Sequence, residues 1–186
     1  MFVRESDFDT NGVLHLLGTR GRTVPYTNPQ TTGRVIVTVS SLLAGPYNLD
    51  GVGGFIDHAR PTAQNQNGNW TNNAAGSFVV VQLPLPLVAT EYTVRHGNSA
   101  GYALRNWNLE GSNDGVDWVV LRQHVNDTTL TVAEYSTATW DVNNPDRLAF
   151  SRFRIITTGF DSSGTQYLSM AGLELYGRVP GGTVAV

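Results

Sequence analysis

The sequence predicts an all-β fold, and more narrowly an antiparallel β-sandwich, on three observations. Short apolar runs rich in Val, Ile, Thr and aromatic residues recur along the 186 residues, with Gly, Asn, Asp or Pro between them. Almost none of these runs has the i, i+3, i+4 spacing of an amphipathic helix. The 20 Gly residues and a charged fraction of 15%, against roughly 25% in typical soluble domains, are typical of a chain of strands and turns.

Nine segments share the strand pattern, which is enough for one sandwich. In chain order they are residues 12–17, 34–40, 78–83, 91–96, 106–111, 117–124, 137–142, 150–157 and 168–176. Alternation indicates the buried face of a strand: Trp107 and Leu109 share one face, and Asn108 and Glu110 share the other. Residues 78–81, Phe-Val-Val-Val, have no polar face, which predicts a central strand covered on both sides.

Turn residues mark the connections between these strands. The run 112–115, Ser-Asn-Asp-Gly, predicts a tight hairpin because Asn, Asp and Gly tolerate positive φ. Residues 59–77 are rich in Asn and Gln and predict a long surface loop, too polar to pack inside. The Gly and Pro content of residues 178–186 predicts a flexible C-terminal tail, which leaves residues 1–177 as a single domain.

The charge composition limits the classes of partner. A formal net charge of −3 provides neither the basic field that binds a phosphate backbone nor a polybasic patch for anionic lipid, so we expect no nucleic acid partner. No apolar run approaches the ~20 residues of a membrane span, so we expect no membrane insertion. The first ten residues lack the apolar core of a signal peptide and the chain has no Cys, which together predict a cytoplasmic location.

The residue types that are missing exclude several chemistries. All twelve basic residues are Arg, so the chain has no Lys for a Schiff base, a nucleophile or a phosphate-binding loop. Without Cys it has no thiol nucleophile and no Cys-ligated zinc. The four His residues, at positions 15, 58, 96 and 124, lack metal-binding spacing, and no Gly-x-Ser-x-Gly elbow occurs. We therefore predict no catalytic residues, no metal and no cofactor, and do not expect an enzyme.

Four segments, taken in order, resemble the discoidin family, the C-type domains first described in coagulation factors. They are residues 8–13 (Phe-Asp-Thr-Asn-Gly-Val) with 17–19, 92–97 (Tyr-Thr-Val-Arg-His-Gly), 103–107 (Ala-Leu-Arg-Asn-Trp) with 111–118, and 167–169 with 173–177 (Leu-Glu-Leu-Tyr-Gly). The likeness is to the intracellular branch, the modules of HECT-type ubiquitin ligases and BTB-domain proteins. It implies an eight-stranded discoidin-like jelly roll that recognises a ligand through loops at one end.

The resemblance assigns recognition to two loops, residues 43–50 and 97–102. Each holds a Tyr, with a flat apolar face and a phenolic donor that suit a contact anchor, and neutral amide and hydroxyl groups lie nearby. A Trp in the polar 59–77 loop is a further candidate to face a partner. The predicted site residues are Tyr47, Asn48, Trp70, Asn98, Ser99 and Tyr102. The alternative reading is that both Tyr residues only cap the end of the barrel.

Calcium, which related sugar-binding modules often hold, is not expected. Asp50-Gly51 matches the first element of that site, but Val52-Gly53-Gly54 follows in place of an acidic loop, and Gly172 stands where a carboxylate is needed. The interpretation of Arg95 is architectural: its guanidinium is expected to hold Glu174 or to cap loop carbonyls.

The remaining Trp residues are expected in the core, at positions 107, 118 and 140. The function that follows is a noncatalytic module that binds a protein partner, in a ubiquitin-ligase or adaptor setting. Two alternatives stay open: a lectin-like carbohydrate-binding domain, for which the aromatic residues would stack on sugar, and a structural subunit of a larger assembly.

Overall fold

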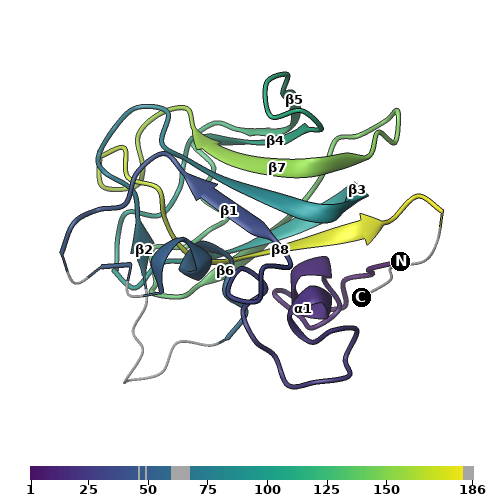
Figure 1. The fold of residues 1–186 in the computed structure, drawn as a ribbon. Coiled ribbons are helices and arrows are strands. Elements are labelled where there is room, and N and C mark those ends of the chain that lie inside the picture. Colours follow the sequence, from purple (N-terminus) through teal and green to yellow (C-terminus); the bar gives the residue numbers. More distant parts are fainter. Residues whose placement is uncertain (46, 49, 60–67, 182–186) are drawn as a thin grey trace.

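The computed structural model describes residues 1–45, 47–48, 50–59 and 68–181, and within them two layers of antiparallel sheet face each other (Figure 1). Eight strands are present in these residues: β1 (Ile36–Val39), β2 (Asn69–Trp70), β3 (Phe78–His96), β4 (Trp107–Ser112), β5 (Val119–His124), β6 (Thr137–Asp141), β7 (Phe150–Thr157) and β8 (Ser169–Arg178). One layer has the order β1-β3-β7-β4-β5 and the other the order β2-β8-β3-β6. The predicted antiparallel β-sandwich is confirmed.

Strand β3 belongs to both layers. We expected two strands, 78–83 and 91–96, but the chain forms one strand of 19 residues. Its pairing with β7 shifts register between Gln82 and Leu87, around two prolines that have no N–H for a ladder hydrogen bond. From Val88 onward it pairs with β8 instead. The prolines therefore stand at the point where the strand passes from one sheet to the other.

The core lies between the two layers and follows the alternation of the strands. Trp107 and Leu109 are fully buried, as predicted. In β3, Val79 and Val81 are fully buried, but Phe78 and Val80, which point to the other face, are half-buried. This part of the strand is therefore covered mainly on one face, and not on both as predicted. The predicted hairpin joins β4 to β5, with φ of +81° at Gly115.

Trp118 is not a core residue, so that prediction is wrong. It is half-buried on the outer side of the β4–β5 hairpin, where its Nε1 donates a hydrogen bond to the Gly115 carbonyl at 3.2 Å. The Arg154 guanidinium stacks on its ring at 4.1 Å from the centroid. A cation over the ring keeps that face toward the polar surface of the sheet.

Residues 12–17, predicted as a strand, form helix α1 (Val13–Gly18). The cause is tertiary: the buried carboxylate of Glu174 in β8 accepts hydrogen bonds from the backbone N–H groups of Leu14, at 2.8 Å, and His15, at 2.9 Å. These two donors would otherwise be unsatisfied at a helix start. A Cβ on Gly12 would overlap the Glu174 side chain, so a glycine is needed there.

The predicted 59–77 surface loop is wrong around residues 69–71, whereas residues 72–76 are exposed as predicted. Asn69, Trp70 and Thr71 are buried, and β2 pairs with β8. Residues 60–67 lie outside the described residues. The Gly-rich run after Asp50 forms a 3-10 helix, η1 (Gly51–Ile56). Of the predicted tail, Arg178 still belongs to β8 and residues 182–186 lie outside the described residues, so the domain boundary stays a prediction.

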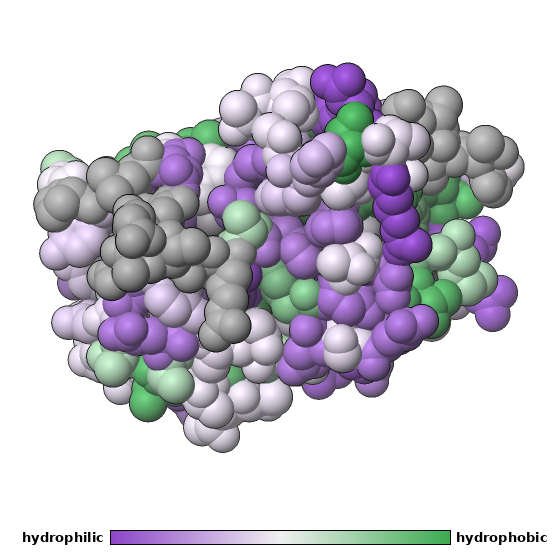
Figure 2. Space-filling model, turned by 90° about the horizontal axis from the view of Figure 1, so that it is seen from below, coloured by the Kyte–Doolittle hydropathy of each residue, from purple (hydrophilic) through white to green (hydrophobic). Residues whose placement is uncertain are grey.

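The sandwich has two unlike ends. Helix α1, the N-terminus and the end of β8 lie at one end, and β2 lies at the opposite end (Figure 1). Figure 2, which shows the molecule from below, has hydrophobic residues in separate small groups among polar ones. Among the described residues, no helix is long and apolar enough to cross a membrane.

Candidate functional site

A pocket of about 290 Å³ lies at the β2 end of the sandwich. We call it the aromatic pocket, and its lining consists of Leu43, Tyr47, Trp70, Asn98, Ser99, Tyr102 and Tyr167. The fold thus brings five of the six predicted site residues to one cavity. The sixth, Asn48, is not part of the lining.

Asn48 supports the pocket through hydrogen bonds to the backbone of two lining residues. Its Oδ1 accepts a hydrogen bond from the Trp70 backbone N–H at 2.7 Å. Its Nδ2 donates to the carbonyl of Leu43 at 3.0 Å and to that of Trp70 at 3.2 Å. Its φ of +62° is one that Asn tolerates better than most residues. Asn48 therefore fixes two lining residues relative to each other.

The loop that carries Asn98, Ser99 and Tyr102 is held by His96, the last residue of β3. The His96 Nε2 lies 3.0 Å from the Ser99 carbonyl and 2.7 Å from the Gly101 carbonyl. Burial lowers the pKa of His96, which favours the neutral imidazole with its proton on Nε2, facing these two acceptors. A buried, neutral histidine thus shapes the loop.

Three lining rings stand nearly at right angles to one another. Trp70 and Tyr102 have centroids 5.1 Å apart at 75°, Trp70 and Tyr167 5.5 Å apart at 82°, and Tyr102 and Tyr167 5.9 Å apart at 77°. Tyr47 lies 6.1 Å from Trp70, tilted by 58°, and is 43% exposed. The Trp70 Nε1 donates to Asn98 Oδ1 at 3.2 Å, which fixes the orientation of the indole.

Two features of this pocket differ from the sequence-based expectation. Trp70, expected on an exposed loop, is only 6% exposed because it sits in β2, yet it still lines the cavity. Tyr167 was missed. It precedes β8, and only the pairing of β8 with β2 and β3 brings it to the pocket. Its place in the family-like segment 167–169 was the one available signal.

Arg95 is architectural, as expected, and Arg105 has the same role. The Arg95 guanidinium donates to the carbonyls of Asp57 at 2.7 Å, Ala59 at 2.8 Å and Ala171 at 2.8 Å. It therefore caps loop carbonyls, while Glu174 caps α1 instead. Arg105 donates through Nη1 to the carbonyls of Leu104, Asp127 and Leu130, at 2.7 to 3.3 Å. Within the described part of the chain, no group of three His, Cys, Asp or Glu side chains could hold a metal ion.

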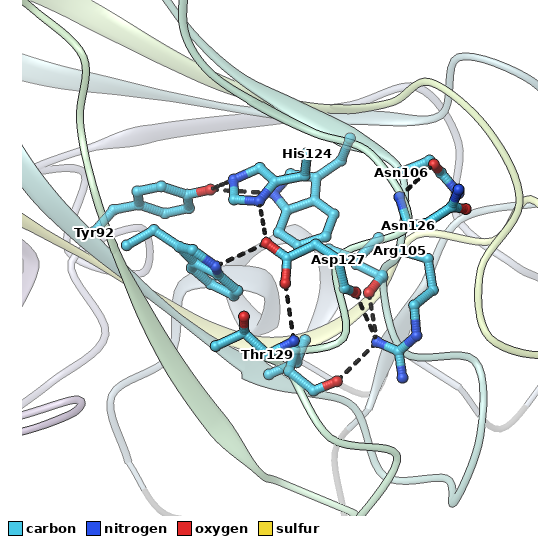
Figure 3. Close-up of polar contacts among 11 residues, drawn as sticks. Tyr92, Arg105, Asn106, His124, Asn126, Asp127 and Thr129 are labelled. Atoms are coloured by element: carbon cyan, nitrogen blue, oxygen red, sulfur yellow. Dashed lines mark hydrogen bonds and ion pairs between the residues drawn. The ribbon is translucent and has the colours of Figure 1, made fainter.

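A second polar cluster, in the core, resembles a catalytic relay at first sight (Figure 3). His124 Nδ1 lies 2.6 Å from Asp127 Oδ2, and its Nε2 lies 2.6 Å from the Tyr92 hydroxyl. Trp107 donates to that hydroxyl, and Trp140 donates to Asp127. Burial raises the pKa of Tyr92 and lowers that of His124, although Asp127 opposes the second shift.

This cluster has the geometry of a core hydrogen-bond network. Tyr92 is fully buried, His124 is 2% exposed, and the Trp107 ring stacks on the imidazole with centroids 3.8 Å apart. A substrate cannot contact groups that are covered in this way, and each polar atom of the chain Tyr92–His124–Asp127 already has a partner.

No protein-family model matches the chain. Among curated proteins it is 37% identical over 185 residues, 97% of its length, to the E3 ubiquitin-protein ligase Ufd4 of Drosophila melanogaster. It is 38% identical over 177 residues, 94% of its length, to the E3 ubiquitin-protein ligase hecd-1 of Caenorhabditis elegans. The chain spans about 6% of the length of each ligase. A BTB/POZ domain-containing protein of Arabidopsis thaliana is 30% identical over 92% of the chain, which spans 21% of that protein.

Solved structures with a similar fold are carbohydrate-binding modules of the CBM32 type. CpGH89CBM32-5 from Clostridium perfringens, solved with GalNAc-β-1,3-galactose, has a TM-score of 0.59 at 14% identity and covers 77% of this chain and 96% of its own. CBM32-3 from a family 31 glycoside hydrolase of the same organism has a TM-score of 0.57 at 15% identity, covering 79% and 93%. The discoidin-like β-sandwich is thus confirmed as the fold.

Proposed function

We propose that the chain is a noncatalytic recognition module that binds a protein partner through the aromatic pocket, within a cytoplasmic ubiquitin-ligase or adaptor protein. The observation that carries the proposal is the convergence of Tyr47, Trp70, Tyr102 and Tyr167 on one cavity from four separate parts of the chain. Aromatic residues of this kind provide large contact areas at a low cost in side-chain entropy and dominate many binding sites.

The size and chemistry of the pocket support recognition without turnover. A volume of about 290 Å³ lies at the lower end of the ~300–1,000 Å³ typical of ligand pockets, so it suits one side chain of a partner. The described residues that line it include no Asp, Glu, His or Arg. The paired His124 and Asp127 belong to the core network. The identity of 37–38% to two ubiquitin ligases supports the proposed setting.

Tyr102→Gly tests the role of the pocket. Tyr102 has φ of +56°, a conformation that Gly adopts without strain, so the substitution removes the ring and leaves the loop intact. We expect capture of the partner from a lysate of the source cell to fall about tenfold or more, with an unchanged melting temperature. Trp118→Leu, on the hairpin of the other sheet, is the matched aromatic control and is expected to retain capture.

Two results would contradict this proposal. Unchanged capture by Tyr102→Gly would mean that the partner binds elsewhere. Loss of the fold together with capture would mean that Tyr102 only caps the end of the barrel. A partner that copurifies in fixed stoichiometry even with Tyr102→Gly would instead indicate a structural subunit.

Carbohydrate binding is the second candidate. It is favoured by the fold of the CBM32 neighbours and by the amide of Asn98 and the hydroxyl of Ser99 at the pocket. Against it, the rings of Trp70, Tyr102 and Tyr167 stand at 75–82° to one another, so together they form no flat platform for a sugar ring. A glycan array is expected to give no signal. A saccharide signal that disappears in Tyr102→Gly would favour the carbohydrate function over the protein-binding one.

A further inference from the structure

Three aromatic rings form walls of the aromatic pocket and are steeply inclined to one another. Trp70, Tyr102 and Tyr167 stand at 75–82° to one another, with centroids 5.1 to 5.9 Å apart. A roughly spherical cavity of about 290 Å³ has a radius of roughly 4 Å, so a cation at its centre lies inside the ~6 Å range of cation–π attraction from the rings that line it.

The other lining residues are suited to a cation whose charge is surrounded by apolar groups. Leu43, Tyr47, Asn98 and Ser99 complete the cavity, and the described lining holds no carboxylate to pair with a bare ammonium. A primary ammonium is strongly hydrated and would lose its water here without an equivalent partner. A methylated ammonium keeps the positive charge but has little water to lose, so aromatic faces can stabilise it well.

We propose that the aromatic pocket is a cage for a methylated ammonium group and that its natural ligand is a trimethylated lysine side chain of the protein partner. This inference rests on the proposed function, because it names the chemistry that the pocket recognises. The chain contains no Lys, so the ligand cannot come from the chain itself.

A choline headgroup carries the same cation but fits less well. In phosphocholine a phosphate follows two carbons from the nitrogen, and among the described residues no Arg lines the pocket to pair with it. In a trimethyllysine the cation sits at the end of an apolar stem, which Leu43 and the exposed Tyr47 ring can cover. The protein source therefore agrees better with the lining.

The test compares three small probes on the whole chain by calorimetry and NMR: a capped trimethyllysine amide, its neutral tert-butyl isostere, and the unmethylated lysine amide. We expect trimethyllysine to bind about tenfold or more tightly than either of the others. Equal or tighter binding of the tert-butyl analogue would overturn the cage, because the pocket would then be merely apolar. Equal binding of unmethylated lysine would overturn it too.

Variants locate the binding and identify the source. Tyr102→Gly and Tyr167→Leu each remove one wall, and each is expected to weaken trimethyllysine binding about tenfold, whereas Trp118→Leu is expected to bind normally. Two wall variants are used so that a folding defect in one, visible in its melting curve, leaves the other as the test. Glycerophosphocholine is expected to bind more weakly than trimethyllysine; tighter binding would overturn the protein source.

The outcome is separable from that of the proposed function. If Tyr102→Gly abolishes partner capture but trimethyllysine fails to bind the unaltered chain, the pocket binds the partner and the cage chemistry is wrong. If trimethyllysine binds and both wall variants bind it equally well, the cation lies elsewhere and the cage is again wrong. Binding that is specific to trimethyllysine and lost in both wall variants supports both proposals.

Discussion

Asn48 and Tyr102 frame the aromatic pocket with left-handed backbone conformations, φ of +62° and +56°. Asn enters this region readily, but a residue as bulky as Tyr does so at a cost that the surroundings must offset. The Tyr102 N–H donates to Ser163 Oγ at 3.0 Å, and its ring packs against Trp70 and Tyr167. The strained backbone of Tyr102 places its ring in the lining of the pocket. This placement agrees better with a role in binding than with a role in packing alone.

At the same scale, Trp107 and Trp118 are expected to differ sharply in their contribution to stability. Trp107→Ala removes a fully buried ring that stacks on His124, and we expect it to lower the free energy of unfolding by ~3–5 kcal/mol through the cavity it leaves. Trp118→Ala, on the outer side of the hairpin, is expected to cost about 1 kcal/mol or less. Urea denaturation measures both. Similar losses for the two variants would contradict the assignment of inner and outer faces.

At the scale of elements, α1 depends on a strand for its start. A helix of six residues is too short to be stable alone, and the Glu174 carboxylate supplies acceptors for two of its first N–H groups. The same carboxylate also accepts from the Leu175 N–H at 3.0 Å. Burial raises the pKa of Glu174 to about 8. The attachment of α1 to β8 therefore contains a titratable group in the core.

Glu174→Gln is expected to change how stability depends on pH. Because the folded pKa, about 8, exceeds the unfolded value near 4.5, the folded state holds an extra proton between these values. The contribution of Glu174 to stability is thus complete below pH 4.5 and is lost as the pH rises to about 8. Between pH 5 and 8 the unaltered chain should lose up to about 1.4 kcal/mol per pH unit relative to the Gln variant.

Urea titrations at half-unit steps of pH provide the measurement. Glu134→Gln, at an exposed position, changes the formal charge equally and should give a curve parallel to that of the unaltered chain. Parallel curves for Glu174→Gln as well would show that the three N–H donors hold the carboxylate ionised.

At the scale of the whole molecule, the four histidines support three different parts of the fold. His124 belongs to the core network, His96 holds the pocket loop, and His15 and His58 pack against each other near α1, with ring centroids 4.5 Å apart. Burial is the largest cause that lowers the pKa of each of the four. All four imidazoles are therefore neutral in the folded state at neutral pH.

Acidification is expected to destabilise the chain. A histidine whose folded pKa lies below the unfolded value of about 6.5 contributes stability that is present above that value and is lost as the pH falls through the folded pKa. Glu174 acts in the opposite direction, but as one group against four. The free energy of unfolding should therefore decline from pH 7 to pH 5, measured in urea at constant ionic strength. A constant or rising value would refute this.

The sequence alone determined the strands whose pattern is local. Alternation assigned the faces of β4, and Asn, Asp and Gly fixed its hairpin, because both signals depend on neighbouring residues. The missing Lys and Cys excluded their chemistries without any structure. Two loops with a Tyr each supplied four of the seven residues that line the pocket, and the polar 59–77 loop supplied a fifth, Trp70.

Tertiary structure alone decided the rest, because each remaining feature needs a partner from a distant segment. Helix α1 exists through a carboxylate 160 residues away, and β2 exists through its pairing with β8. Asn48 was expected to contact a ligand, but its side-chain amide is hydrogen-bonded to the backbone of Trp70, 22 residues on, and so supports the pocket. Tyr167 lines the pocket only because β8, which it precedes, pairs with β3. Such long-range hydrogen bonds and ring contacts leave no periodicity in the sequence, so no local pattern predicts them.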